Sequence, residues 1–179
     1  TAADTPSSTA EPDLIPILPT DPILGDKRAP ATLVIFDDFG CPACRSEMTM
    51  LHTLLTSYPR RFKIIWKGLS TTRIPYSSEE AHAYAVCAHE QNRFADIEQK
   101  IFSGGELALT SEMLLKIMSE ANLDTKQLAA CLKGPNPSNY LKTNESLAQA
   151  LGIQAVPTIF LNNKQIEPPQ TIEGWKTAL

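Results

Sequence analysis

Two cysteines, Cys41 and Cys44, lie between a continuous apolar run at residues 33–36 and a segment at residues 45–57 that favours helix. A short apolar run with β-branched residues and no helical period predicts a buried strand over residues 31–37. The chain must therefore turn from a strand into a helix at the cysteines. Because positions i and i+3 share one face of a helix, the two sulfurs can reach bonding distance.

The start of this helix gives the two thiols different chemistry. Cys41 falls in the N-cap region, where free backbone N–H groups and the positive end of the helix dipole favour a thiolate. Pro42 suits the first helical position, because its missing N–H has no helical partner to lose. We therefore predict a thiol–disulfide exchange site with Cys41 as the catalytic attacking thiolate and Cys44 as the resolving thiol.

Metal sites are the alternatives at these cysteines. The same spacing supplies half of many zinc sites, but zinc needs two more ligands, and the remaining candidates form no second closely spaced pair: Cys87, Cys131, His52, His82 and His89. We place His82 and His89 on helix surfaces. Met48 and Met50 are compatible with a soft copper site, although methionines near a helix start more often pack or line a peptide groove. We predict no metal and no cofactor.

Size and charge restrict the function further. A chain of 179 residues can build one hydrophobic core that carries a substantial insertion. The net charge of −4 and a pI near 5.4 provide no basic field for nucleic acid. The apolar runs are far shorter than the roughly 20 residues that cross a bilayer. A start at Thr1 and an even count of four cysteines agree with a mature exported protein in an oxidising compartment.

We expect four parts along the chain. Residues 1–20, rich in proline, form a flexible leader or a membrane tether. Residues 21–76 hold the strand–helix–strand unit, with a second, parallel strand at residues 62–68. Residues 77–151 form an inserted helical subdomain. Residues 152–179 return to the sheet with a hairpin, 158–161 and 164–167, turning at Asn162 and Asn163, and end in a helix anchored by Trp175.

The insertion contains five expected helices and two cysteines. The helices span residues 81–92, 94–102, 112–121, 126–133 and 140–151, and Ser77 with Glu80 suggests a capping box before the first of them. Cys87 and Cys131 fall on different helices. They form a structural disulfide, a second redox pair or two buried free thiols, and the even cysteine count favours the disulfide. Such a bridge would stabilise the fold by about 3 to 4 kcal/mol.

The order of these elements resembles the thioredoxin superfamily, and specifically its DsbA-like disulfide-bond oxidoreductases. The similarity runs from about residue 21 to the C-terminus and is carried by residues 21–25, 29–30, 36–45 with the Cys-Pro-Ala-Cys motif, the cysteines of the insertion, and residues 151–160 with Val-Pro-Thr. It implies an α/β, thioredoxin-like fold with a central mixed sheet and an inserted all-helical subdomain.

The resemblance also assigns a substrate site to Val156 and Pro157. In this family the matching proline is cis, and its loop faces the active-site disulfide and binds substrate backbone as an added strand. A valine before the proline is similar to the oxidases rather than the isomerases, which tend to have threonine there. The isomerases also carry an N-terminal dimerisation domain that thirty proline-rich residues cannot supply, and this favours a monomer.

Two departures from the family pattern affect the expected chemistry. Many relatives have a buried acid six positions before the first cysteine, where this chain has Ile35. Asp37, on the same strand face, or Asp38 must then serve in proton transfer to the resolving thiol, unless both simply solvate the end of the strand. Ala43 replaces the histidine of strongly oxidising relatives, and both aspartates would oppose a nearby thiolate, so we expect a weaker oxidant.

Together these features predict a periplasmic or otherwise extracytoplasmic oxidoreductase that introduces disulfide bonds into exported polypeptides. The family resemblance implies reduced polypeptides as substrates and a quinone-linked membrane protein as the partner that reoxidises Cys41 and Cys44. Two alternatives stay open: a reductase or isomerase with few clients, and a non-catalytic thioredoxin-like module that binds copper or client proteins.

Overall fold

The strand–helix–strand unit around the cysteines forms the centre of the fold in the computed structural model, which describes residues 14–179. β2 (Ala31–Asp37) leads into α1 (Pro42–Ser57), and β3 (Phe62–Gly68) returns parallel to β2. The parallel register pairs Ala31 with Phe62 and Asp37 with Gly68. The carboxyl end of β2 therefore delivers the chain directly to the first turn of α1.

Three further strands complete a mixed sheet of order β1-β3-β2-β4-β5. β4 (Thr158–Leu161) pairs antiparallel with β2, and β5 (Lys164–Ile166) pairs antiparallel with β4. The predicted turn between them is present, with Asn162 and Asn163 both at positive φ, a conformation that asparagine tolerates. β1 (Ile23–Gly25) adds an antiparallel edge to β3. The predicted α/β class with a central mixed sheet is confirmed.

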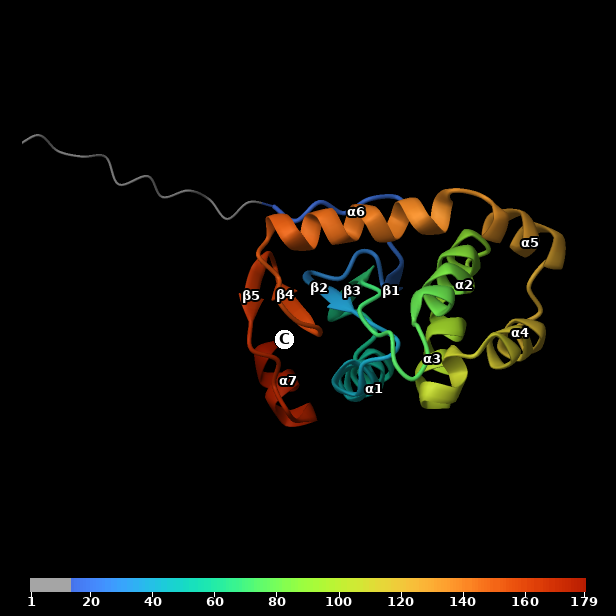
Figure 1. Cartoon of the computed structure of the whole chain (residues 1–179). Helices are drawn as coiled ribbons and strands as arrows, with labels where there is room; N and C mark the ends of the chain where they lie inside the picture. Colours follow the sequence, from blue (N-terminus) through green and yellow to red (C-terminus); the bar gives the residue numbers. More distant parts are fainter. Residues whose placement is uncertain (1–13) are drawn as a thin grey trace, which may run out of the picture.

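Helices cover the two faces of the sheet unequally. Figure 1 shows α6 (Asn136–Ala150) along one face, and α1 with α7 (Ile172–Ala178) along the other. Alternation along β2 divides its side chains between these layers: Leu33 and Ile35 belong to the large core on the α1 side, and Val34 and Phe36 to a smaller cluster that includes Ala148 of α6. Trp175 is fully buried, as predicted for the anchor of the closing helix.

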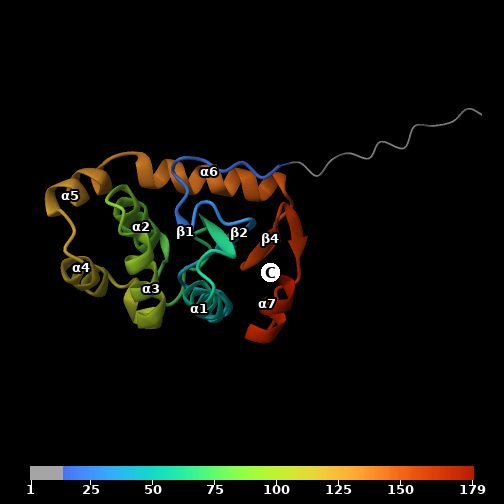
Figure 2. The same ribbon diagram turned by 180° about the vertical axis from the view of Figure 1, so that it is seen from behind.

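The remaining helices stand together at the β1 edge of the sheet (Figures 1 and 2). They are α2 (Glu79–Glu90), α3 (Phe94–Gly104), the short 3₁₀ helix η1 (Gly105–Leu109), α4 (Ser111–Glu120) and α5 (Thr125–Lys133). The predicted capping box is wrong, because α2 begins after Ser78 and the Glu80 carboxylate accepts the Ser111 hydroxyl instead. α6 runs without a break from this group onto the sheet. The boundaries predicted for the inserted helical subdomain, residues 77 and 151, stay a prediction.

The chain before β1 lies against the body over the part of the predicted leader that the structure describes. Ile15 is buried, and its N–H donates to the side-chain oxygen of Asn163 at 3.0 Å. The buried ammonium of Lys67 donates to the Asp21 carboxylate at 2.6 Å and to the Pro16 carbonyl at 2.9 Å. Ordered packing therefore begins before residue 21. Residues 1–13, the rest of the predicted leader, lie outside the described residues.

Candidate redox site

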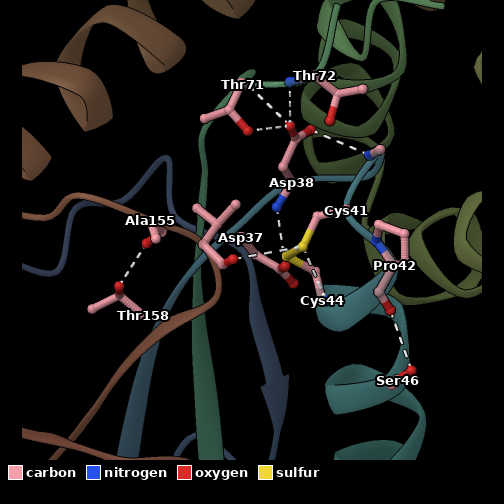
Figure 3. The surroundings of a disulfide bond; sticks show 12 residues. Asp37, Asp38, Cys41, Pro42, Cys44, Ser46, Thr71, Thr72, Ala155 and Thr158 are labelled. Atoms are coloured by element: carbon pink, nitrogen blue, oxygen red, sulfur yellow. Dashed lines mark hydrogen bonds between the residues drawn. A yellow bond between two sulfur atoms is a disulfide. The ribbon is translucent and has the colours of Figure 1, made fainter. Parts of the chain in front are cut away.

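Cys41 and Cys44 form a disulfide at the start of α1, with their Cα atoms 5.2 Å apart (Figure 3). Cys41 is the N-cap residue, and its sulfur accepts the Cys44 backbone N–H at 3.1 Å. Pro42 occupies the first helical position. Cys41 is half-buried, whereas Cys44 is completely buried. Cys41 is therefore the more accessible of the two cysteines to an incoming thiolate.

A second loop reaches this disulfide from a distant part of the sequence. The Val156–Pro157 peptide bond is cis, and the Val156 carbonyl oxygen lies 3.7 Å from the Cys41 sulfur. The pairing of β4 with β2 brings this loop there, because β4 starts at Thr158, directly opposite Phe36 near the end of β2. The structure thus brings together the predicted redox and substrate-binding residues, although their roles stay predictions.

Asp38 is buried between the cysteine turn and the loop after β3. Its Oδ2 accepts the Thr71 N–H at 2.9 Å, the Thr71 hydroxyl at 2.6 Å and the Thr72 N–H at 2.7 Å. Figure 3 shows Asp38 facing Thr71 and Thr72. Its Oδ1 accepts from Gly40 N–H at 3.3 Å and lies 3.0 Å from Nε2 of His82. Burial alone would raise the pKa of Asp38, but the hydrogen bond and charge of His82, with the Thr71 hydroxyl, hold this pKa well below its ordinary value.

Asp37 has the opposite electrostatic environment. Its carboxyl is completely buried, and within residues 14–179 it accepts two hydrogen bonds, from the Trp66 indole N–H at 3.2 Å and the Asp38 backbone N–H at 3.0 Å. Burial, reinforced by the nearby Glu98 carboxylate, raises the pKa of Asp37 well above its ordinary value. The environment therefore favours the protonated form of Asp37 and the ionised form of Asp38. The alternative that both aspartates solvate the end of a strand is wrong, because neither is exposed.

The predicted surface position of His82 is wrong. Its side chain is fully buried, and its ring stacks on Trp66 at a centroid distance of 5.4 Å and packs on Phe39 at 4.9 Å. Its partner, Asp38, lies 44 positions away in the sequence, so no local pattern identifies the pair. His89, in contrast, is half-buried at the end of α2, where its ring touches the edge of Phe94.

Glu98 and Glu47 are buried carboxyl groups that no sequence prediction singled out. Glu98 on α3 is fully buried and lies 2.7 Å from Nε2 of His52 on α1. Glu47 on α1 accepts the indole N–H of Trp175 at 2.6 Å and so ties α7 to α1. Burial raises the pKa of both carboxyl groups. For Glu98 a signal exists in the sequence, since it lies midway between two aromatic residues at helical spacing, where an apolar residue is expected.

The structure joins Cys87 of α2 to Cys131 of α5 in a second disulfide, buried within the helical group. Its distance along the chain from the Cys-Pro-Ala-Cys motif and its burial fit a structural bridge.

Met48 is buried in the core under α1, and Met50 is half-buried. Among residues 14–179, no three His, Cys, Asp or Glu side chains gather in a metal-binding arrangement, and no helix there is both long and apolar enough to span a bilayer.

The second strand of the mixed sheet leads into a helix that is capped by the Cys-Pro-Ala-Cys disulfide, and a cis-proline loop lies opposite this disulfide. This arrangement defines a protein of the thioredoxin fold with a redox-active disulfide. A family model described as Thioredoxin matches residues 18–179, and the chain therefore belongs to the thioredoxin family. The DsbA-like resemblance inferred from the sequence is confirmed, and so is the thioredoxin-like fold.

Curated relatives fall into two groups. The probable disulfide bond formation protein D of Bacillus anthracis is 27% identical over 158 residues, covering 83% of this chain and 73% of the relative. The Na(+)/H(+) antiporter NhaA 3 of Salinispora tropica is 26% identical over 168 residues, covering 93% of this chain but only 25% of the antiporter. The chain thus spans about a quarter of that relative.

Solved structures show the same fold. The catalytic domain of Proteus mirabilis ScsC superposes with a TM-score of 0.75 at 20% identity and covers 88% of this chain and 86% of its own. Oxidised BdbD from Bacillus subtilis superposes with a TM-score of 0.74, also at 20% identity, and covers 89% and 90%.

Proposed function

We propose that this chain is a thiol–disulfide oxidoreductase that donates the Cys41–Cys44 disulfide to reduced polypeptides outside the cytoplasm. The observation that carries the proposal is the unequal placement of the two sulfurs. The Cys41 sulfur is reachable, sits at a helix N-terminus and lies against the Val156 carbonyl, whereas the Cys44 sulfur is buried beneath it. The resemblance to disulfide bond formation protein D supports the same activity.

The reaction proceeds by two exchanges. A substrate thiolate attacks the Cys41 sulfur, the Cys41–Cys44 bond breaks, and Cys44 leaves as a thiolate. Asp37, which holds a proton on the same face of the sheet, protonates this buried thiolate. A second substrate thiolate then attacks the substrate sulfur bonded to Cys41, which forms the substrate disulfide and releases Cys41 as a thiolate at the N-terminus of α1.

The substrate chain binds beside Val156 and Pro157 during these steps. The loop before β4 places a backbone carbonyl next to the Cys41 sulfur, and an extended peptide can add its own backbone hydrogen bonds at such an edge. Substrate and disulfide would then meet without any movement of the sheet.

Oxidation is the favoured direction because neither aspartate opposes the Cys41 thiolate as strongly as the sequence suggested. Asp37 is neutral when protonated, and the charge of Asp38 is opposed by His82 and dispersed over backbone and hydroxyl donors. A stabilised thiolate stabilises the reduced pair and raises its reduction potential. Ala43 still supplies no positive charge, so we expect a potential below that of relatives with histidine between the cysteines.

The working form we propose is a monomer in the periplasm or an equivalent compartment, reoxidised by a quinone-linked membrane partner. The buried Cys87–Cys131 disulfide agrees with an oxidising environment. The membrane tether that we propose is the predicted leader, residues 1–20, of which residues 1–13 lie outside the described part of the chain.

The decisive test is the redox state of Cys41 and Cys44 in the living cell that makes the protein. Acid quenching followed by alkylation and mass spectrometry should find the pair mainly as a disulfide, as a donor requires. A pair found mainly as dithiol would instead identify a reductase or isomerase. A purified protein that binds Cu(I) but does not oxidise a reduced dithiol peptide would identify a non-catalytic module.

A further inference from the structure

Glu98 is a buried carboxyl group that the fold does not account for. It has no exposed surface, and within the described residues its Oε1 atom has no hydrogen-bond partner. Burying a carboxyl group without full pairing costs free energy that an apolar side chain at the same place would not cost. A carboxyl group buried at this cost on the apolar face of α3 indicates that Glu98 has a functional role.

The placement of Glu98 on α3 directs it toward Asp37. Phe94, Glu98 and Phe102 are spaced by four residues and share one face of the helix. The Phe94 ring packs 5.0 Å from Trp66, between ring centroids, and the Phe102 ring 5.0 Å from Phe39. Glu98 therefore faces the aromatic cluster between these contacts, and Trp66 in that cluster donates to the Asp37 carboxyl. The charge of Glu98 also raises the pKa of Asp37, after the larger effect of burial.

α1 provides the connection from Glu98 to the surface. Cys44, Met48 and His52 share one face of this helix at spacings of four residues, so His52 lies about 12 Å along the helix from Cys44. Nε2 of His52 lies 2.7 Å from Glu98, while Nδ1 lies 3.0 Å from the Gln99 side-chain amide. The side chain of His52 is 18% exposed.

His52 opens onto a surface hollow of about 310 Å³. Its walls carry hydroxyl, amide and imidazole groups, from Thr49, His52, Thr53, Thr56, Gln99 and Ser103. Such a polar hollow admits water and small buffer molecules to the imidazole. His52 has one nitrogen on a buried carboxyl and the other on the exposed Gln99 side chain at the hollow. A partly exposed imidazole in such a position has the arrangement of a proton shuttle.

We propose that Glu98 and His52 carry protons between solvent and the buried side chains of Asp37 and Cys44. This inference rests on the proposed oxidoreductase function. When the Cys41–Cys44 bond breaks, the Cys44 thiolate takes the proton of Asp37. His52 then passes a solvent proton to the Glu98 carboxylate, and Glu98 passes it on to Asp37. The path runs in reverse on reoxidation. Asp38, held ionised by its donors, is not part of the path.

The test is the rate of disulfide reduction by dithiothreitol in one turnover at fixed pH, followed by acid quench and alkylation. Glu98→Gln keeps the size and hydrogen-bonding ability of the side chain but cannot transfer a proton. We expect it to slow reduction about tenfold or more, while a side chain that transfers the proton directly typically contributes roughly a hundredfold to ten-thousandfold. The matched control is Glu47→Gln, a buried carboxyl on α1 that faces Trp175 instead. It should change the rate less than twofold.

Chemical rescue separates proton transfer from structure. His52→Ala should slow reduction by a similar factor, and free imidazole entering the hollow should restore the rate in proportion to its concentration. Equal rates for wild type and Glu98→Gln would overturn the path, as would a slow, folded His52→Ala protein that imidazole does not rescue. In both cases the wild type still oxidises the dithiol. A wild type that does not react at all would instead refute the proposed function, and the path with it.

Discussion

Replacing Asp38 with asparagine tests how far one buried carboxylate organises the redox site. The carboxylate holds the loop at Thr71 and Thr72 against the turn that precedes Cys41, and it lies on the buried imidazole of His82. Asparagine has nearly the same shape but no charge, and its amide group donates where one carboxylate oxygen accepted. The change therefore removes electrostatics and hydrogen bonding while leaving volume almost constant.

The magnitude follows from the five donors around the carboxylate. Hydrogen bonds to a charged group contribute roughly 1.5 to 3 kcal/mol each, against about 1 kcal/mol for neutral pairs. Four of the five contacts have donor–acceptor distances of 3.0 Å or less. If each loses about 1 kcal/mol of its charge-assisted strength, Asp38→Asn lowers the free energy of unfolding by about 4 kcal/mol. For a protein of this size the melting temperature should fall by about 12 °C.

Acid strengthens the test because the stabilisation by Asp38 depends on its ionisation. Its pKa is lowered in the folded protein, so the contribution is complete above the unfolded value near 4 and is lost as pH falls through the folded pKa. The gap in stability between wild type and Asp38→Asn should therefore be widest at neutral pH and narrow below about pH 4.

The assay is urea unfolding followed by tryptophan fluorescence at several pH values, paired with the rate at which a mild disulfide reagent modifies Cys41 in the reduced protein. Asp96→Asn is the control, because Asp96 forms an exposed ion pair with Arg93 in the first turn of α3, and such pairs contribute little to stability. Asp38→Asn should also slow Cys41 modification several-fold, because the turn before Cys41 is released. A loss below about 1 kcal/mol with unchanged Cys41 reactivity would refute the organising role.

Three further predictions concern the other buried groups. Replacing both Cys87 and Cys131 with alanine opens a loop with a sequence separation of 44 and should destabilise the protein by about 4 kcal/mol in urea unfolding; a loss under 1 kcal/mol would mean that the bridge is not structural. Asp37→Asn should remove a decline in stability as pH rises above about 4, since a raised folded pKa favours the protonated state, and matching pH profiles for both proteins would contradict this. Cys44→Ser should trap a mixed disulfide when its Cys41 thiolate attacks an added peptide disulfide and releases one peptide thiolate, because no resolving thiol is left; mass spectrometry detects the adduct, and adducts on other residues would contradict the assigned attack site.

The parts of the site that the sequence predicted are those encoded by short segments. The apolar strand, the cysteine spacing and Pro42 at the helix start together determine where Cys41 and Cys44 lie, because strand and helix are contiguous. The Asn162–Asn163 turn is likewise local, and it sets the pairing of the last two strands. The approach of Val156 to Cys41 was available only from the family resemblance.

The parts that escaped the sequence analysis arise from contacts between elements far apart in the chain. The sequence around His82 follows an ordinary helical pattern, which predicts a surface position. The packing of α2 against β3 instead buries His82, with its Nε2 atom in contact with the Asp38 carboxylate. The contact between His52 on α1 and Glu98 on α3 joins two residues that are 46 positions apart in the sequence. Hydrophobic periodicity assigns a polar residue to solvent, so it misplaces a polar residue whose partner comes from another element.

The central claim is that the Cys41–Cys44 disulfide passes to another polypeptide through Cys41. The most direct measurement mixes one equivalent of the oxidised protein with a reduced dithiol peptide under anaerobic conditions and counts disulfides in both partners by mass spectrometry. The account predicts that the peptide gains one disulfide while Cys41 and Cys44 become thiols, and that Cys41→Ser protein transfers none. A peptide that stays reduced while the Cys41–Cys44 bond stays intact would contradict it.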